Sequence, residues 1–113
     1  TGAVHGAAWC SLDGDILLLR EDVGRHNALD KLIGKILKNN VDRHNGFIFV
    51  SSRLSYEMSQ KAIAIGAPML VGASAAVSKA LSEAEKYGLC LVGFARPGRH
   101  LIYTHSYRIQ NTL

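Results

Sequence analysis

The residue types best suited to chemistry gather in one short stretch of the chain, residues 21–31. This stretch combines two acids, an arginine, a histidine and an asparagine, namely Glu21, Asp22, Arg25, His26 and Asn27. It lies between an apolar run and an amphipathic one, so it falls where a strand turns into a helix. Free N–H groups and the positive dipole end of a helix start attract anions, which is typical of a binding site. A capped, solvated turn is the alternative interpretation.

The pattern of apolar residues predicts an α/β domain that would position this stretch. Residues 4–12 and 16–19 are expected to form strands joined by a tight turn at Asp13-Gly14, which is typical of a β-hairpin. Strands and helices then alternate, with strands predicted at 47–50, 69–71, 89–94 and 101–103 and helices beginning near 28, 55 and 74. This alternation predicts right-handed crossovers and a largely parallel sheet with helices on both faces.

Polar residues recur after the predicted strands. Ligands bind beyond the carboxyl ends of parallel strands in such sheets. The residues expected at this edge, including the start of the antiparallel first strand, are His5, Asp22, Arg25, His26, Ser51, Ser52, Arg53, Ser55, Ser74, Arg96 and Arg99. Arginines, hydroxyls and imidazoles together favour an anion, above all phosphate. Helix caps and surface arginines explain each residue taken singly. The opposite edge carries less distinctive sequence, such as Asn39-Asn40.

Composition limits the possible classes of protein. A chain of 113 residues with 48% hydrophobic content fits a single domain, 1–113, with one core. The net charge of +4 is compatible with an anionic partner, but Lys31, Lys35 and Lys38 are spaced as on a solvated helix face. Cys10 and Cys90 lie in apolar runs and indicate buried thiols in a reducing compartment. No membrane span or signal sequence is evident, so we expect a cytoplasmic location.

Motifs for catalysis are missing. The sequence holds no glycine-rich phosphate loop, no dinucleotide fingerprint and no nucleophile elbow. We therefore expect no residue of this chain to be catalytic, and we expect its polar residues to bind rather than react.

Several segments carry a family pattern: residues 1–8, 21–31, 51–58 and 93–99. Together they resemble the FdhD family of formate dehydrogenase accessory proteins over nearly the whole chain, although Ala3 stands where that family usually has glycine. The resemblance implies a three-layer α/β/α, cytidine-deaminase-like fold whose mixed sheet has an N-terminal β-hairpin followed by βαβ units.

The zinc signature of true deaminases is missing from this sequence. No glutamate follows His26, and Ser52-Arg53-Leu54-Ser55 stands where true deaminases have Pro-Cys-x-x-Cys. We therefore expect no zinc.

The resemblance also implies a function. Proteins of this family are understood to pass sulfur from a cysteine desulfurase to the molybdenum or tungsten bis-guanine-dinucleotide cofactor of formate dehydrogenase. They carry the persulfide on a Cys-x-x-Cys loop upstream of the segment present here. The chain would then be the C-terminal, cofactor-binding portion, without that loop. The cofactor-binding stretch implied by the resemblance is Phe94, Ala95, Arg96, Pro97, Gly98 and Arg99. The edge described above adds His5, Arg25, His26, Ser52 and Arg53 to the expected binding residues.

The expected cargo is molybdenum bis(molybdopterin guanine dinucleotide), with guanosine diphosphate as a surrogate ligand. The expected partners are a cysteine desulfurase, formate dehydrogenase and a second copy of the chain in a homodimer, with neither nucleic acid nor membrane. Whether the chain is itself an enzyme stays open, since it lacks the persulfide cysteine. One alternative is a nucleotide-binding regulatory module without a role in sulfur transfer. Another is a deaminase-fold nucleic-acid binder, which the basic pI favours and the lack of a basic run disfavours.

Overall fold

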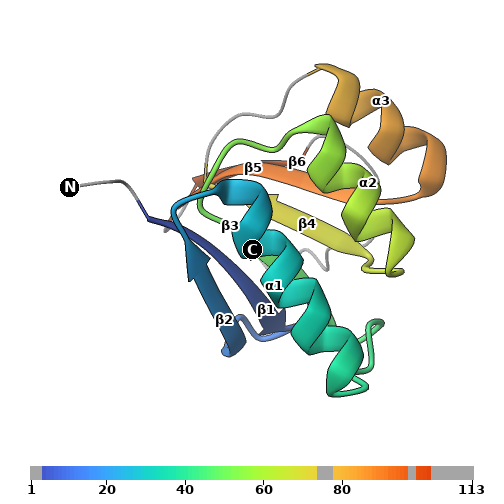
Figure 1. Ribbon diagram of the computed structural model, residues 1–113. Coiled ribbons are helices and arrows are strands. Elements are labelled where there is room, and N and C mark those ends of the chain that lie inside the picture. The colour runs from blue at the N-terminus through green and yellow to red at the C-terminus, as the bar shows by residue number, and fades with distance from the viewer. Residues whose placement is uncertain (1–3, 74–77, 97–98, 103–113) are drawn as a thin grey trace.

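The computed structural model describes residues 4–73, 78–96 and 99–102 (Figure 1). Its elements follow in the order β1 (His5–Ser11), β2 (Ile16–Asp22), α1 (Arg25–Lys38), β3 (Gly46–Val50), α2 (Tyr56–Ala64), β4 (Met69–Gly72), α3 (Ser78–Tyr87), β5 (Cys90–Arg96) and β6 (Arg99–Ile102). Within these residues, no helix has both the length and the apolar character needed to cross a bilayer.

The strands form one mixed sheet in the order β2-β1-β3-β4-β5-β6. Strand β1 is antiparallel to both β2 and β3, so β2 and β3 run in the same direction. Strands β3, β4 and β5 are parallel, and β6 returns antiparallel to β5. The β1–β2 hairpin turns at Gly14, whose φ of 93° is readily adopted by glycine. The predicted mixed sheet, N-terminal hairpin and βαβ units are confirmed.

Helices α1, α2 and α3 lie on the same face of the sheet (Figure 1). The crossovers β2-α1-β3, β3-α2-β4 and β4-α3-β5 all advance in one direction along the strand order. Right-handed crossovers that advance in one direction place their helices on one side. The described residues therefore differ from the expectation of helices on both faces.

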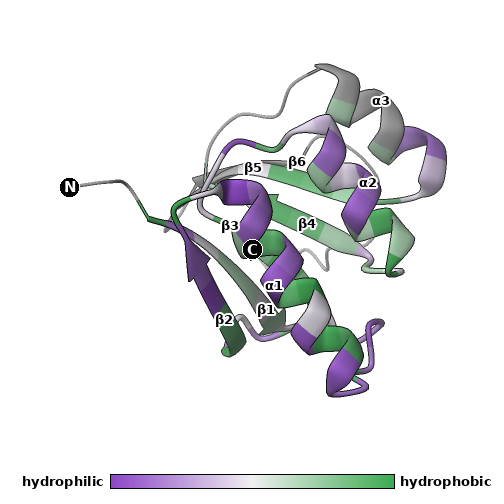
Figure 2. Ribbon diagram, in the orientation of Figure 1, coloured by the Kyte–Doolittle hydropathy of each residue, from purple (hydrophilic) through white to green (hydrophobic). Residues whose placement is uncertain are grey.

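Alternation along the strands divides the buried residues into two clusters. The larger lies between the sheet and the helices, where Trp9 and Ile48 pack with Leu29 and Leu32 of α1. The intervening strand residues form the smaller cluster, made of Val71, Cys90 and Val92 with Phe47, Phe49 and Met69 packed against it. Figure 2 shows hydrophobic residues along β4 and β5 and a mixture of hydrophilic and hydrophobic residues along α1 and α2. This period-two pattern is what buried strands require.

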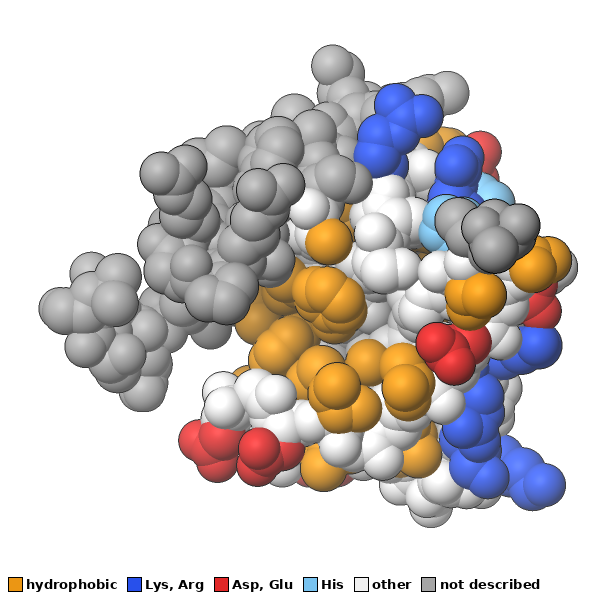
Figure 3. Space-filling model, turned by 90° about the vertical axis from the view of Figure 1, so that its left-hand side faces the viewer, with side chains coloured by type: hydrophobic (Ala, Val, Ile, Leu, Met, Phe, Trp, Pro, Cys, Tyr) orange, Lys and Arg blue, Asp and Glu red, His pale blue; other side chains and the backbone are white. Residues whose placement is uncertain are grey.

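Strand β2 forms one edge of the sheet and exposes apolar residues. Ile16, Leu17 and Leu19 are each exposed, while Leu18 packs against the core. Figure 3 shows hydrophobic side chains grouped on the face of the molecule seen from this side.

On the helical side, the Lys61 ammonium lies 2.7 Å from the Asp30 carboxylate and joins α2 to α1. A surface pair of this kind contributes about 0–1 kcal/mol.

Gly46 lets β3 approach β1 closely. A methyl group at this position would meet the Cys10 carbonyl oxygen and would lie 2.7 Å from Cζ2 of Trp9. Gly46→Ala should therefore lower the free energy of unfolding by about 1–3 kcal/mol, because a packed backbone and a buried indole must shift. Urea unfolding followed by circular dichroism measures the change.

Gly34 provides the matched control for this prediction. It lies in α1, is exposed, and would place a methyl group with nothing within 4 Å. Gly34→Ala should raise the free energy of unfolding by about 0.5–1 kcal/mol through helix propensity. Equal stability changes of the same sign in both variants would contradict the close approach at Gly46.

Candidate functional site

The candidate site is the edge of the sheet at which β2, β3, β4 and β5 end and at which β1 and β6 begin. We refer to it as the carboxyl edge. The predicted residues within the described chain fall along it as follows: His5 begins β1, Arg25 and His26 begin α1, Ser52 and Arg53 follow β3, Phe94, Ala95 and Arg96 end β5, and Arg99 begins β6. Pro97 and Gly98 lie outside the described residues. The topology thus places segments from between residues 5 and 99 along one edge of the sheet.

The carboxyl edge is long. Neighbouring strands lie about 4.8 Å apart, so β2 and β5, which are separated by β1, β3 and β4, lie about 19 Å apart. In the strand register, His5 of β1 lies opposite Asp22 of β2. Arg96 of β5 lies opposite Arg99 of β6, towards the other end of the sheet. A single phosphate cannot contact both ends. A ligand that uses the whole edge must be extended.

The carboxylate of Asp22 organises the turn between β2 and α1. Its Oδ2 lies 2.7 Å from Nζ of Lys31, and its Oδ1 accepts the Gly24 N–H at 2.9 Å. The Asn27 amide donates to the same Oδ1 at 3.5 Å, and Lys31 also donates to the carbonyl of Glu21 at 3.3 Å. Lys31 lies on a solvated helix face, as predicted, and in addition has a structural role. The strand end and the first turns of the helix are joined through one carboxylate.

These contacts lower the pKa of Asp22 to about 2 from 3.8. The main cause is the hydrogen bond from Lys31, followed by the Gly24 N–H. Asp22 is therefore ionised near neutral pH. The Lys31 ammonium neutralises the negative charge of Asp22. The positive charge of the neighbouring Arg25 is therefore not neutralised by this carboxylate.

Basic residues occupy the start of α1, where they do not favour the helix. The N-cap residue Gly24 offers no side-chain cap, and the first turn contains no acid. The Arg25 guanidinium instead stands beside the positive end of the dipole, which is destabilising for a helix. No ion pair involves Arg25 in the described part of the chain. An anion bound at this helix start would offset both effects.

The segment after β3 has a structural part and an exposed part. The Ser51 hydroxyl accepts the Gly6 N–H at 2.8 Å, and the Ser51 N–H donates to the Gly6 carbonyl at 3.0 Å. Ser52, a predicted binding residue, is only 8% exposed, with its hydroxyl 3.7 Å from Sδ of Met58. Its hydroxyl thus points to the core. Ser55 caps α2 by accepting the Met58 N–H at 3.3 Å, which agrees with the alternative interpretation of a helix cap.

Arg53 is the exposed cation of this segment. It has no ion pair among the described residues. It follows β3, which is the direct neighbour of β1, the strand that His5 begins. Figure 3 shows basic and histidine side chains next to each other near the top of one face. Within the described ranges, no three His, Cys, Asp or Glu side chains are grouped to hold a metal ion. The described part of the edge therefore offers cations and imidazoles, which suit an anionic ligand.

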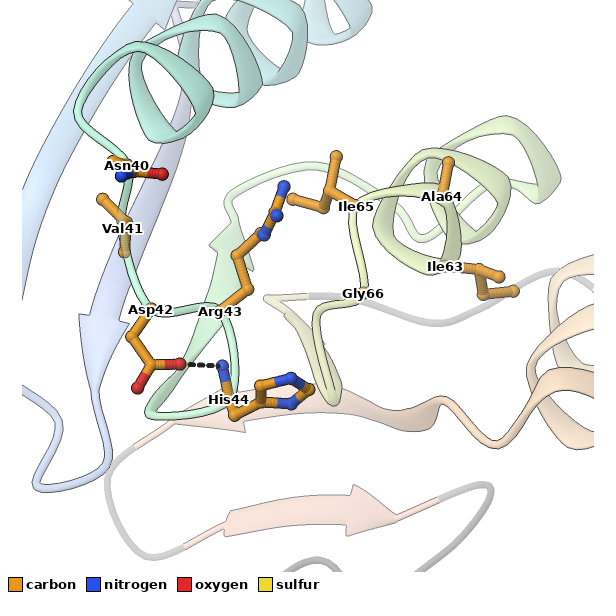
Figure 4. Close-up of a pocket in the computed structure, with 9 residues that line it drawn as sticks. All are labelled: Asn40, Val41, Asp42, Arg43, His44, Ile63, Ala64, Ile65 and Gly66. Atoms are coloured by element: carbon orange, nitrogen blue, oxygen red, sulfur yellow. Dashed lines mark hydrogen bonds between the residues drawn. The ribbon is translucent and has the colours of Figure 1, made fainter.

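Two cavities of the described chain lie at the opposite edge of the sheet, which we call the amino edge. They are lined by the loop that follows α1, by the end of α2 and by the end of α3, and Figure 4 shows the larger one. The sequence pattern does not predict them, because this edge carries less distinctive sequence, such as Asn39-Asn40. The available signal was Arg43-His44, two adjacent basic residues in a loop.

Asp22→Asn tests the organising role of this carboxylate. The variant should be less stable than the wild type near neutral pH, because it loses the ionised partner of Lys31. A pKa lowered by folding stabilises the folded state above about pH 4, and that contribution disappears as the pH falls towards about 2. The difference in free energy of unfolding should therefore shrink between these values, as measured by urea unfolding at a series of pH values. Lys31→Gln should reproduce the loss near neutral pH. A difference that stays constant down to pH 2 would contradict the assignment.

Comparison with known proteins agrees with the resemblance. The sequence model of the FdhD/NarQ family matches residues 1–110. The sulfur carrier protein FdhD of Variovorax paradoxus is 54% identical over 109 residues, which cover 96% of this chain and 39% of that protein. The protein of the same name from Cupriavidus necator is 49% identical over 111 residues, covering 98% of this chain and 38% of its own length.

A solved structure agrees with the fold. A formate dehydrogenase accessory protein from Desulfotalea psychrophila matches with a TM-score of 0.90 at 34% identity, covering 97% of this chain and 49% of that chain. The chain thus spans about two fifths of the length of the curated relatives and about half of the solved protein. Since the family match extends over residues 1–110, the chain belongs to the FdhD/NarQ family.

Proposed function

We propose that this chain is the cargo-binding part of a sulfur carrier that serves formate dehydrogenase, and that its cargo is molybdenum bis(molybdopterin guanine dinucleotide). The observation that carries the proposal is the alignment of basic and imidazole residues from β1, α1, the β3–α2 segment and the β5–β6 hairpin along one edge. The names of the relatives, sulfur carrier protein and formate dehydrogenase accessory protein, supply the context.

The charge balance of the edge supports an anionic cargo. Asp22 is neutralised by Lys31, whereas Arg25 and Arg53 have no ion pair within the described residues. Guanidinium groups bind phosphate through paired N–H donors, and free helix N–H groups bind it through the backbone. The diphosphate of a dinucleotide offers oxygens for both kinds of donor.

The length of the edge supports an extended cargo. About 19 Å separate β2 from β5, so one small anion cannot engage both α1 and the β5–β6 hairpin. A cofactor with two nucleotide ends has phosphates and bases far enough apart to occupy separate parts of the edge. We assign the β5–β6 hairpin to one diphosphate, because Arg96 and Arg99 lie opposite each other in the strand register and so place two arginines at the tip of the hairpin.

In the whole protein, we assign this chain the role of binding the cargo. Sulfur would come from a cysteine desulfurase onto a Cys-x-x-Cys loop outside the present chain, and the sulfurated cargo would pass to formate dehydrogenase. The described residues would bind and orient the cargo phosphates during this transfer. We further propose that the whole protein acts as a homodimer in the cytoplasm.

Guanosine diphosphate tests the hairpin assignment, since it carries the base and diphosphate of the proposed cargo. Calorimetry should detect binding to the wild type, and Arg96→Ala or Arg99→Ala should weaken it by roughly 10- to 150-fold. This range follows from the 1.5–3 kcal/mol of a charge-assisted hydrogen bond. Arg99→Lys should be intermediate, because lysine keeps the charge and loses the guanidinium fork.

Lys38→Ala is the matched control, because it removes one positive charge at the end of α1 farthest from the carboxyl edge. It should bind as the wild type does. Far-UV circular dichroism confirms that each variant is folded. Equal affinity in the wild type and both arginine-to-alanine variants would place the ligand elsewhere.

The cysteines of this chain should not carry sulfur. Cys10 and Cys90 are 4% and 0% exposed, and burial raises the pKa of the Cys10 thiol, which disfavours the reactive thiolate. After incubation with a cysteine desulfurase and cysteine, intact-mass spectrometry should show no added sulfur. A persulfide on either residue would contradict a purely cargo-binding role for this chain.

A further inference from the structure

Strand β2 lies at one end of the sheet, and within the described residues no strand pairs with its outer side (Figure 1). It is seven residues long and exposes Ile16, Leu17 and Leu19. An apolar edge strand of this kind is a template to which a strand of another molecule can add. Its pairing with β1 is irregular next to Ile16, and such an irregularity disfavours strand addition. The regular half of the edge, residues 18–22, does not have this protection.

The register of β1 and β2 shows which backbone groups face the outer edge. Gly6 of β1 lies opposite Glu21 of β2. Both backbone groups of Gly6 are used on its other side, because its N–H donates to the Ser51 hydroxyl at 2.8 Å and its carbonyl accepts the Ser51 N–H at 3.0 Å. In an antiparallel ladder, opposite residues either exchange both hydrogen bonds or exchange neither. The N–H and carbonyl of Glu21 therefore point away from β1, and those of Leu19, two residues earlier, do the same.

The two outward carbonyls are already bound by cations of this chain. Nη1 of Arg20 donates to the Leu19 carbonyl at 2.6 Å. Nζ of Lys31 donates to the Glu21 carbonyl at 3.3 Å and lies 2.7 Å from Oδ2 of Asp22. An added strand would have to displace these donors, because its own N–H groups need the same carbonyls. It would also desolvate Arg20, which has no ion pair in the described part of the chain.

We propose that β2 is a strand-addition surface for a second copy of this chain, and that Arg20 and Lys31 keep this surface closed. A second copy fits because its own β2 exposes the same leucines. Two β2 strands paired antiparallel about Leu19 would bring the two Leu19 side chains together and remove them from water. While both carbonyls are bound, the regular half of the edge lacks the acceptors that a ladder requires. The inference goes beyond the proposed function and does not depend on the cargo, and it implies that the proposed homodimer uses another surface.

Sedimentation velocity over a range of protein concentrations, combined with hydrogen–deuterium exchange, tests the inference. The double variant Arg20→Ala/Lys31→Ala frees both carbonyls and should self-associate at least about tenfold more tightly than the wild type. In the associated variant, the amide hydrogens of Leu19 and Glu21 should be protected from exchange, whereas in the wild type they should exchange freely. Arg20→Lys should behave more like the wild type, because lysine keeps a charged donor beside the Leu19 carbonyl.

Lys38→Ala/Lys86→Ala is the matched control. It removes the same number of positive charges from two exposed positions near the ends of α1 and α3. It should sediment as the wild type does. Far-UV circular dichroism confirms that each variant is folded, and Arg20→Ala is compared with Lys38→Ala if the double variant is not.

Three results would overturn the inference. One is a double variant of the two edge cations that associates no more than the control. Another is association that leaves the amides of Leu19 and Glu21 unprotected, since the contact would then lie elsewhere. The third is protection of these two amides in the wild type, because the edge would then already be paired.

Discussion

The direction of strand β1 determines where the chemistry of this chain can assemble. β1 lies between β2 and β3 and is antiparallel to both, which makes β2 and β3 parallel to each other. The residues after β2 therefore reach the same edge as those after β3, β4 and β5, and His5 joins them from the start of β1. Burial of Trp9 beneath α1 and the close approach allowed by Gly46 hold β1 in this place. The residues after β2 and at the start of β1 belong to the carboxyl edge because this one strand is antiparallel to both of its neighbours.

Asp22 connects the end of β2 to the start of α1 through its side-chain contacts. By contacting Lys31 and the Gly24 N–H together, it joins the end of β2 to the first turns of α1, where Arg25 and His26 lie. The same interaction neutralises the acid that would otherwise repel an anionic ligand. A structural contact thus also sets the electrostatic character of the neighbouring surface.

Local signals were sufficient for much of the fold. Asp13-Gly14 predicted the hairpin, and the apolar run at 47–50 became the core of β3, Gly46–Val50. The start of α1 was predicted near residue 28 but lies at Arg25, because residues 25–27 provide neither apolar periodicity nor a capping side chain. The common face of the helices depends on strand order, which the sequence pattern alone does not specify.

The candidate site could be predicted only in part for similar reasons. Strand ends indicated which residues share the carboxyl edge, but not that the Ser52 hydroxyl turns towards Met58 or that Lys31 pairs with Asp22. Such contacts depend on side-chain direction and on packing between elements. The cavities at the amino edge were not predicted because the loop after α1 and the end of α2, which line the larger one, are distant in sequence, and only the folded chain places Arg43 opposite Ile65 (Figure 4).

The most direct test is to map the amide signals of the labelled chain as guanosine diphosphate is added. If the carboxyl edge binds the cargo, shifts should concentrate at Gly24–Asn27, after β3 and at the β5–β6 hairpin, while residues 40–45 stay unchanged. Shifts confined to the amino edge, or saturating binding with no change at the carboxyl edge, would contradict a cargo site at that edge.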